Sequence, residues 1–277
     1  MTQPGSLRRM PLIAAHTPKA MTHATPTPDR QHAATIGATI GATTAAGTPP
    51  RFDVYTLIHK AWRVFLADTL QRVGRLDVDD DAEREQACAQ VQALMQQMRL
   101  HLQHENEYLH AAIEARHPGG ARRTGEDHLH HADAIRNLDD QALALRQARP
   151  GHRAALALRL YRQLALFVAD NLAHMHVEET DNHALLWSLY DDAELLAIHD
   201  QILAALGPDE MAQTLRWLAR GLSPQELAQL FGGLRASAPP AAFEALYDVA
   251  LAQLDESRRG KLARALGLPP VPGLVAV

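Results

Sequence analysis

The stretch HLQHENEYLH, at residues 101–110, holds three histidines and two glutamates in ten positions. Imidazole nitrogens and carboxylate oxygens are ligands that iron, manganese and zinc accept in proteins. A second stretch, HMHVEE at residues 174–179, has the same His-x3-Glu spacing at His174 and Glu178. Residues four apart lie on one face of a helix, about one turn apart. Each stretch can therefore present an imidazole and a carboxylate in the same direction.

Apolar residues at a spacing of three or four mark the face of each long helix that we expect to be buried. Four such faces can be followed along the chain, and each contains at least one histidine. Their polar members are His59 in the first helix, His101 and Glu105 in the second, His128 and His131 in the third, and Asn171, His174 and Glu178 in the fourth. Burying an unpaired carboxylate is costly, so these faces predict a shared partner, namely a metal centre. Paired carboxylates inside a helix bundle commonly hold two metal ions.

The alternative for any single position is an ordinary core histidine, which is the more frequent role of one buried imidazole. Agreement among four helices favours the metal centre. His104 is expected to flank the site or to face a neighbouring helix or water. Glu107 and Glu179 are expected to be solvated, although Glu179 is next to Glu178 and could replace it. The other histidines are assigned to surfaces or to the surroundings of the site: His110, His117, His130, His152, His176, His183 and His199.

Helical periodicity dominates the chain after residue 51, and breakers divide it into segments. We predict an all-α fold, in which an antiparallel up-down-up-down four-helix bundle at residues 51–190 precedes a helical extension at 191–277. Residues 1–50, rich in Thr, Ala, Pro and Gly, are predicted to be a disordered low-complexity tail. The expected bundle helices are 52–73, 81–116, 125–149 and 152–190, and the shorter ones are 191–206, 208–221, 223–236 and 240–266.

Composition excludes several classes of function. The formal net charge is -5 and there is no stripe of Lys and Arg, so no nucleic-acid partner is expected. No apolar run is long enough for a membrane span, and the N-terminal residues make a poor signal peptide. The single cysteine, Cys88, excludes an intramolecular disulfide. These features together predict a cytoplasmic protein.

Four motifs in this order resemble the hemerythrin-like (HHE cation-binding) family. They are LIHKAW around His59, HLQHE around His101, EDHLHH around His128, and HMHVEE around His174. The resemblance covers residues 51–190. It implies a four-helix bundle around a non-haem di-iron centre that binds dioxygen or nitric oxide, or that handles iron, peroxide or oxidative stress.

The chain departs from the oxygen-carrying hemerythrins at two places, and this indicates a bacterial or sensor-type member. The third helix of those proteins carries His-x3-His, whereas His128 and His131 are three apart here. Their last helix carries His-x4-Asp, whereas this chain has His174-x3-Glu178. The choice between His128 and His131 as ligand stays open, and the preceding aspartate favours His128.

Our hypothesis assigns nitrogen ligation to His59, His101, His128 with or without His131, and His174. Glu105 and Glu178 would bridge or cap two iron ions, with zinc or manganese as alternative metals. Ligating imidazoles need a partner for their other nitrogen, and Tyr55 and Asn171 are the candidates for that role.

Two other functions compete with a di-iron binding protein for a diatomic ligand. One is a di-iron enzyme of the peroxidase or ferroxidase kind, and the other is a metal-free helical interaction module. The C-terminal helices are expected to cover the bundle surface, or to contact a protein partner or a second subunit of a homo-oligomer.

Overall fold

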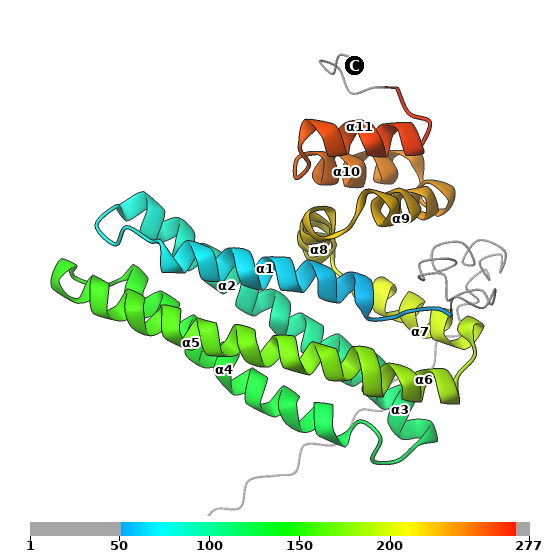
Figure 1. Cartoon of the computed structure of the whole chain (residues 1–277), viewed down its shortest axis with the longest axis horizontal. Helices are drawn as coiled ribbons and strands as arrows, with labels where there is room; N and C mark the ends of the chain where they lie inside the picture. The colour runs from blue at the N-terminus through cyan, green and yellow to red at the C-terminus, as the bar shows by residue number, and fades with distance from the viewer. Residues whose placement is uncertain (1–50, 270–277) are drawn as a thin grey trace, which may run out of the picture. The chain divides into compact units, whose positions relative to one another are not determined.

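The structure, a computed structural model, describes residues 51–269 (Figure 1). All regular secondary structure among these residues is helical, which confirms the predicted all-α class. The expected disordered tail at residues 1–50 lies outside the described residues. The elements are α1 (Thr56–Gly74), α2 (Asp81–His104), η1 (Glu105–His110), α3 (Ala111–Arg116), α4 (Arg122–Arg146), α5 (Pro150–Val177), η2 (Glu178–Asn182), α6 (His183–Leu189), α7 (Asp192–Ala205), α8 (Pro208–Gly221), α9 (Pro224–Ser237), α10 (Pro240–Leu251) and α11 (Glu256–Ala265).

Capping residues explain where the long helices begin. Asp53 accepts hydrogen bonds from the backbone N–H groups of Tyr55 and Thr56, so α1 begins at residue 56 rather than at 52. The Asp80 side chain accepts hydrogen bonds from two backbone N–H groups at the start of α2. Pro150 occupies the first turn of α5, where a missing N–H costs nothing. The break expected at this proline is therefore the start of the next helix.

Four long helical stretches pack side by side around one apolar core. Helix α4 contacts α2 and α5, and α1 contacts the same two helices (Figure 1). The core takes buried residues from all four, including Leu66, Leu94, Leu138 and Leu164. These residues lie on the faces that the 3/4 spacing selects. The polar residues on the same faces must therefore be buried beside this core.

The C-terminal helices cover part of α1. Trp217 of α8 stacks on Phe65 of α1, with ring centroids 3.9 Å apart. Gly221 brings α8 close to α1, because a Cβ at this position would lie 2.8 Å from the carbonyl oxygen of Lys60. Close packing of this kind fixes α8 against the helices that carry the candidate site.

The single helix expected at residues 240–266 is wrong. The structure has two helices there, α10 and α11, separated by a turn at residues 252–255. Asp255 caps α11 by accepting a hydrogen bond from the Arg258 backbone N–H. An N-cap aspartate binds backbone N–H groups that a continuous helix would use, so Asp255 favours a new helix start over a continuous helix.

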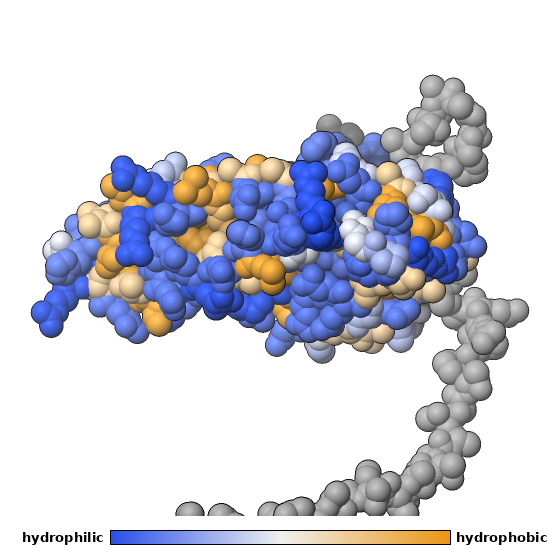
Figure 2. Space-filling view, turned by 90° about the horizontal axis from the view of Figure 1, so that it is seen from below, coloured by the Kyte–Doolittle hydropathy of each residue, from blue (hydrophilic) through white to orange (hydrophobic). Residues whose placement is uncertain are grey.

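Large apolar side chains are exposed mainly on α4 and α5. They are Leu129, Leu143, Leu158, Tyr161, Leu166 and Leu172. The face in Figure 2 carries its hydrophobic residues in separate groups between hydrophilic ones. Scattered exposure of this kind is normal for a protein surface. A partner or second subunit at the C-terminal helices stays a prediction. Among the described residues, none of the helices is both long and apolar enough to cross a membrane.

Candidate metal centre

Two groups of imidazoles and carboxylates lie between the four long helical stretches, and all of these side chains are buried except His101, which is partly buried. One group consists of Glu105, His128, His174 and Glu178, and the other of His59, His101 and Glu105. Within each group, one nitrogen or oxygen atom of every residue lies within 4.8 Å of those of the others. Glu105 belongs to both groups, so the two groups form one continuous cluster. A buried His/Glu cluster of this kind can hold a metal ion.

Each glutamate directs one oxygen atom toward each group. Oε1 of Glu105 lies 3.5 Å from Nε2 of His59, and its Oε2 lies 3.5 Å from Nε2 of His128. Oε2 of Glu178 lies 3.6 Å from Nε2 of His59, and its Oε1 lies 3.3 Å from Nε2 of His174. Both carboxylates are therefore placed between the two sets of imidazoles.

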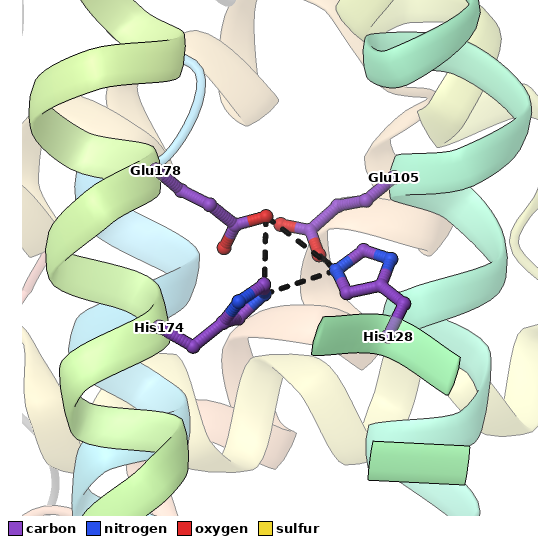
Figure 3. A group of neighbouring side chains, drawn as sticks. All are labelled: Glu105, His128, His174 and Glu178. Atoms are coloured by element: carbon purple, nitrogen blue, oxygen red, sulfur yellow. Dashed lines mark hydrogen bonds and ion pairs between the residues drawn. The ribbon is translucent and has the colours of Figure 1, made fainter. Parts of the chain in front are cut away.

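Figure 3 shows how four of these side chains converge. Glu178 and His174 project from one helical stretch, and Glu105 and His128 approach them from α2–η1 and α4. The Nε2 atoms of His128 and His174 are 3.0 Å apart. Two donor atoms bound to one metal at about 2.1 Å lie roughly 3.0 to 3.4 Å from each other in octahedral or tetrahedral geometry. The observed separation fits two ligands of the same ion.

Several buried polar atoms of the cluster lack partners, and this also fits a cation. Both oxygens of Glu178, Oε2 of Glu105 and Nε2 of His101 make no hydrogen bond within residues 51–269. Buried carboxylate oxygens without partners are rare, because their desolvation is not compensated. Metal ions bound in the two groups would compensate these atoms.

The outer nitrogens of three imidazoles are held by oxygen acceptors. Nδ1 of His59 lies 3.0 Å from Oε1 of Glu179. Nδ1 of His128 lies 2.9 Å from Oδ1 of Asn106. A carboxylate partner similarly places the proton of His174 on Nδ1, which lies 3.3 Å from Asp127. A proton fixed on Nδ1 leaves the Nε2 lone pair directed into the cluster, as metal-binding histidines require.

The electrostatic environment favours ionised carboxylates, but it affects the imidazoles differently. Burial lowers the pKa of His101 to about 4. Burial raises the pKa of Glu178, yet the imidazole nitrogens of His110, His128 and His174, 3.3 to 3.8 Å from its Oε1, hold that pKa well below its usual value. Burial also lowers the pKa of His59, but the surrounding carboxylates raise it to about 9. A cation entering the cluster would thus meet two carboxylates and would replace a proton at His59.

Both glutamates occupy the first position of a π-helical segment. Segment η1 begins at Glu105 and η2 begins at Glu178. A π-turn inserts one extra residue into a helix, and such segments occur frequently at functional sites. The insertion shifts the buried face, so residues five positions later, His110 and His183, are buried. Because Glu105 and Glu178 each begin a π-helical segment, the backbone around the two carboxylates has the same local conformation.

His110 completes one side of the cluster. Its ring stacks on that of His128 at 4.7 Å, and its Nε2 lies 3.8 Å from Oε1 of Glu178. Thr124 Oγ1 lies 3.1 Å from the same nitrogen and accepts a hydrogen bond from Asn182. His110 therefore belongs to the surroundings of the site rather than to the surface.

His131 is buried but belongs to neither group. Its Nε2 is 2.9 Å from Oδ2 of Asp170. Its ring lies 4.8 Å from that of His174. Because Asp170 occupies its Nε2, His131 contacts a ligand candidate without joining the cluster, whereas His128 lies inside it.

Tyr55 and Asn171, the predicted partners of the imidazoles, make no hydrogen bond to a histidine in the described part of the chain. The Asn171 side-chain N–H donates to the carbonyl of Phe167, one turn earlier, and not to His174. The Tyr55 hydroxyl makes no hydrogen bond to a described residue, although its ring lies 5.3 Å from that of His59. The acceptors for His59, His128 and His174 come instead from adjacent helical stretches.

The sequence predicts a solvated Glu179, but the structure places its carboxylate against His59, with the side chain only partly exposed. Besides His59, it accepts hydrogen bonds from both terminal nitrogens of Arg63, at 2.6 and 2.8 Å. Burial raises the pKa of Glu179, but His59 and Arg63 lower it to about 2. A negative charge is thereby fixed directly behind the His59 ring.

A sequence signal for His110 and His183 exists. HLQHENEYLH and HMHVEETDNH both read His-x3-Glu-x4-His. The last interval is too long for one α-helical face, and only a π-turn brings its two ends to the same side. His183 is buried beside Tyr55 and Trp187, with ring centroids 5.8 and 4.2 Å away. The repeated interval thus marks the two π-segments.

Comparison with known proteins does not assign this chain to a family. No protein-family model matches the chain, and no curated protein sequence matches it either.

Proposed function

We propose that this chain is a hemerythrin-like protein in which an antiparallel four-helix bundle holds a non-haem di-iron centre. Four histidines, His59, His101, His128 and His174, would supply nitrogen ligands. The four motifs in the sequence and the packing of the four long helices support this assignment. The centre would bind or sense dioxygen or nitric oxide, or take part in handling iron and oxidative stress.

The observation that carries the proposal is the placement of the two carboxylates. Glu105 and Glu178 each present one oxygen to His59 and the other to the histidines of the second group. A carboxylate that serves one ion needs only one such set of neighbours. Two carboxylates placed between two sets of imidazoles are suited to a pair of ions, as in other carboxylate-bridged bundles.

The ligand count leaves room for a small molecule. Two imidazoles and two shared carboxylates give each ion four protein donors, whereas iron accepts about six. Iron would supply redox chemistry and affinity for a diatomic ligand. The protein would hold the imidazoles in the correct tautomer through Glu179, Asn106 and Asp127 and would exclude bulk water from the buried carboxylates.

Metal analysis of the protein, purified after expression with and without added iron, tests this function. We expect about two iron ions per chain and near-ultraviolet absorption that changes on reduction or on addition of nitric oxide. Glu105→Gln and Glu178→Gln should each lower the iron content by at least half. Glu107→Gln is the matched control, because Glu107 lies on the same π-segment but is exposed.

Other outcomes would replace the proposal. Equal iron content in Glu105→Gln and Glu107→Gln would show that the cluster is not the binding site. Zinc or manganese in place of iron would change the metal. A chain without metal, folded identically with and without chelator, would point to a helical interaction module. Sustained turnover of peroxide or ferrous iron would assign an enzyme.

A further inference from the structure

An apolar cavity of about 220 Å³ lies between α1, α2 and the C-terminal helices. Its walls include Leu57 and Ile58 of α1, Leu218 of α8, Leu230 and Leu234 of α9, and Leu246 of α10. A cavity of ~150 Å³ with similar walls can hold a benzene molecule. This space therefore fits one molecule of the size of a substituted aromatic ring.

The cavity has a polar end that reaches the candidate metal centre. His101 and Glu105 are part of its lining, together with Trp62 and His104. Nε1 of Trp62 and Nδ1 of His104 are buried and have no hydrogen-bond partner in the described part of the chain. Trp62 itself is 3% exposed, so its N–H donor is withdrawn from bulk water. Apolar walls with a few unpaired polar atoms are characteristic of a ligand-binding site.

The two unpaired polar atoms, one donor and one acceptor, match the hydrogen-bonding capacity of a hydroxyl group. The indole N–H of Trp62 can only donate a hydrogen bond. Nε2 of His104 is engaged by Oε1 of Glu210 at 2.8 Å, which places its proton on Nε2 and leaves Nδ1 as an acceptor. A hydroxyl can accept from the first group and donate to the second. An apolar hydrocarbon alone would leave both atoms unpaired.

The charges around the cavity exclude an anionic ligand. Its lining contains the carboxyl groups of Asp53, Glu105 and Glu210, and no lysine or arginine. A carboxylate or phosphate would therefore be desolvated without a counter-charge. An uncharged occupant meets no such penalty.

We propose that this cavity binds an uncharged, hydroxyl-bearing apolar molecule, such as a small phenol or alcohol, with its hydroxyl at the end nearest His101 and Glu105. This goes beyond metal binding and diatomic-ligand binding, and it assigns a role to the C-terminal helices. In this proposal the C-terminal helices form one wall of the cavity, in addition to covering part of α1.

Calorimetric titration with three probes of similar shape tests the proposal. The probes are p-cresol, toluene and 4-methylbenzoate, and the protein is the full chain with and without its metal. We expect one p-cresol per chain, toluene bound about tenfold more weakly for want of its hydrogen bonds, and no saturable binding of 4-methylbenzoate. Binding in the metal-free chain would stand even if the metal proposal fails.

Matched variants locate the bound probe. Leu218→Trp fills the cavity and should abolish binding, with Leu234→Phe as a smaller replacement if the first variant does not fold. Leu166→Trp is the control, because Leu166 is 65% exposed on α5 and lies outside the cavity. Trp62→Phe should weaken p-cresol binding toward that of toluene, because it removes one of the two hydrogen bonds. No saturable p-cresol binding, equal binding of the benzoate, or full binding in folded cavity-filling variants would overturn the proposal.

Discussion

The carboxylate behind His59 offers a direct test of how the protein tunes one metal position. Glu179→Gln keeps the shape of the side chain and an oxygen acceptor for Nδ1 of His59, but removes the negative charge. It also weakens the paired hydrogen bonds from Arg63. We expect weaker metal binding at the group that contains His59 and His101. The group that contains His128 and His174 should be much less affected.

The expected magnitude follows from the position of Glu179. Removing the outer partner of a metal-bound imidazole typically costs about 10- to 100-fold in metal affinity, or roughly 1.4 to 2.7 kcal/mol. The Glu179 side chain is 19% exposed, and solvent screens part of its charge. We therefore expect the lower end, about a tenfold loss at one position.

Competition with a chelator measures this loss. If the wild-type chain holds two ions as proposed, it should release both at similar chelator concentrations. Glu179→Gln should release one ion at about one tenth of the concentration needed for the other. Thr180→Ala is the control, because Thr180 is the neighbouring residue but is exposed, and its hydroxyl donates a hydrogen bond to the backbone carbonyl of His176.

Two results would refute this reasoning. If Glu179→Gln released both ions together, the two groups would not be separate metal positions. If it released neither more easily than the control, the hydrogen bond to His59 would have no part in metal affinity.

Three further predictions test other parts of the structure. His131→Gln should keep the full metal content, measured by elemental analysis; loss of an ion would make His131 a ligand. Gly221→Ala should lower the melting temperature, because the new methyl group meets the Lys60 carbonyl and overpacking costs about 1–3 kcal/mol. Gly232→Ala should raise it slightly, because nothing lies within 4 Å. In the metal-free chain, burial lowers the pKa of His59 but neighbouring carboxylates raise it to about 9. Its charged interactions therefore stabilise the fold fully below about pH 6.5 and are lost as the pH rises through 9. Urea unfolding should accordingly show the difference between wild type and His59→Gln shrinking over that interval.

The sequence predicts the buried polar residues well where the helix is regular. The 3/4 spacing selects His59, His128 and His174 because each lies in an unbroken α-helix beside apolar residues of the same face. The burial of Glu105 and Glu178 is predicted as well, because each lies one regular turn after a histidine of the buried face, His101 or His174, at the point where the α-helix ends.

Prediction fails where the periodicity changes or where contacts come from another helix. Spacing of three or four continued through η1 leads to Leu109 or Ala112 and misses His110, which the π-turn brings to the same side as Glu105. The partners of the imidazoles, such as Asn106 and Glu179, could not be selected from one helix alone. Their roles depend on how adjacent helices are rotated relative to each other, and spacing along one helix does not contain that information.

The division of ligands between the two helical pairs has a mechanical consequence. The imidazoles of one group come from α1 and α2, and those of the other come from α4 and α5. Each glutamate contacts imidazoles of both pairs. Bound ions would therefore link the two hairpins directly, in addition to their apolar packing, the connecting segment and ion pairs such as Arg63–Glu179. Metal binding would then slow amide hydrogen exchange most where the two hairpins meet. Under a pulling force, the main resistance to separating the hairpins would come from the bound ions.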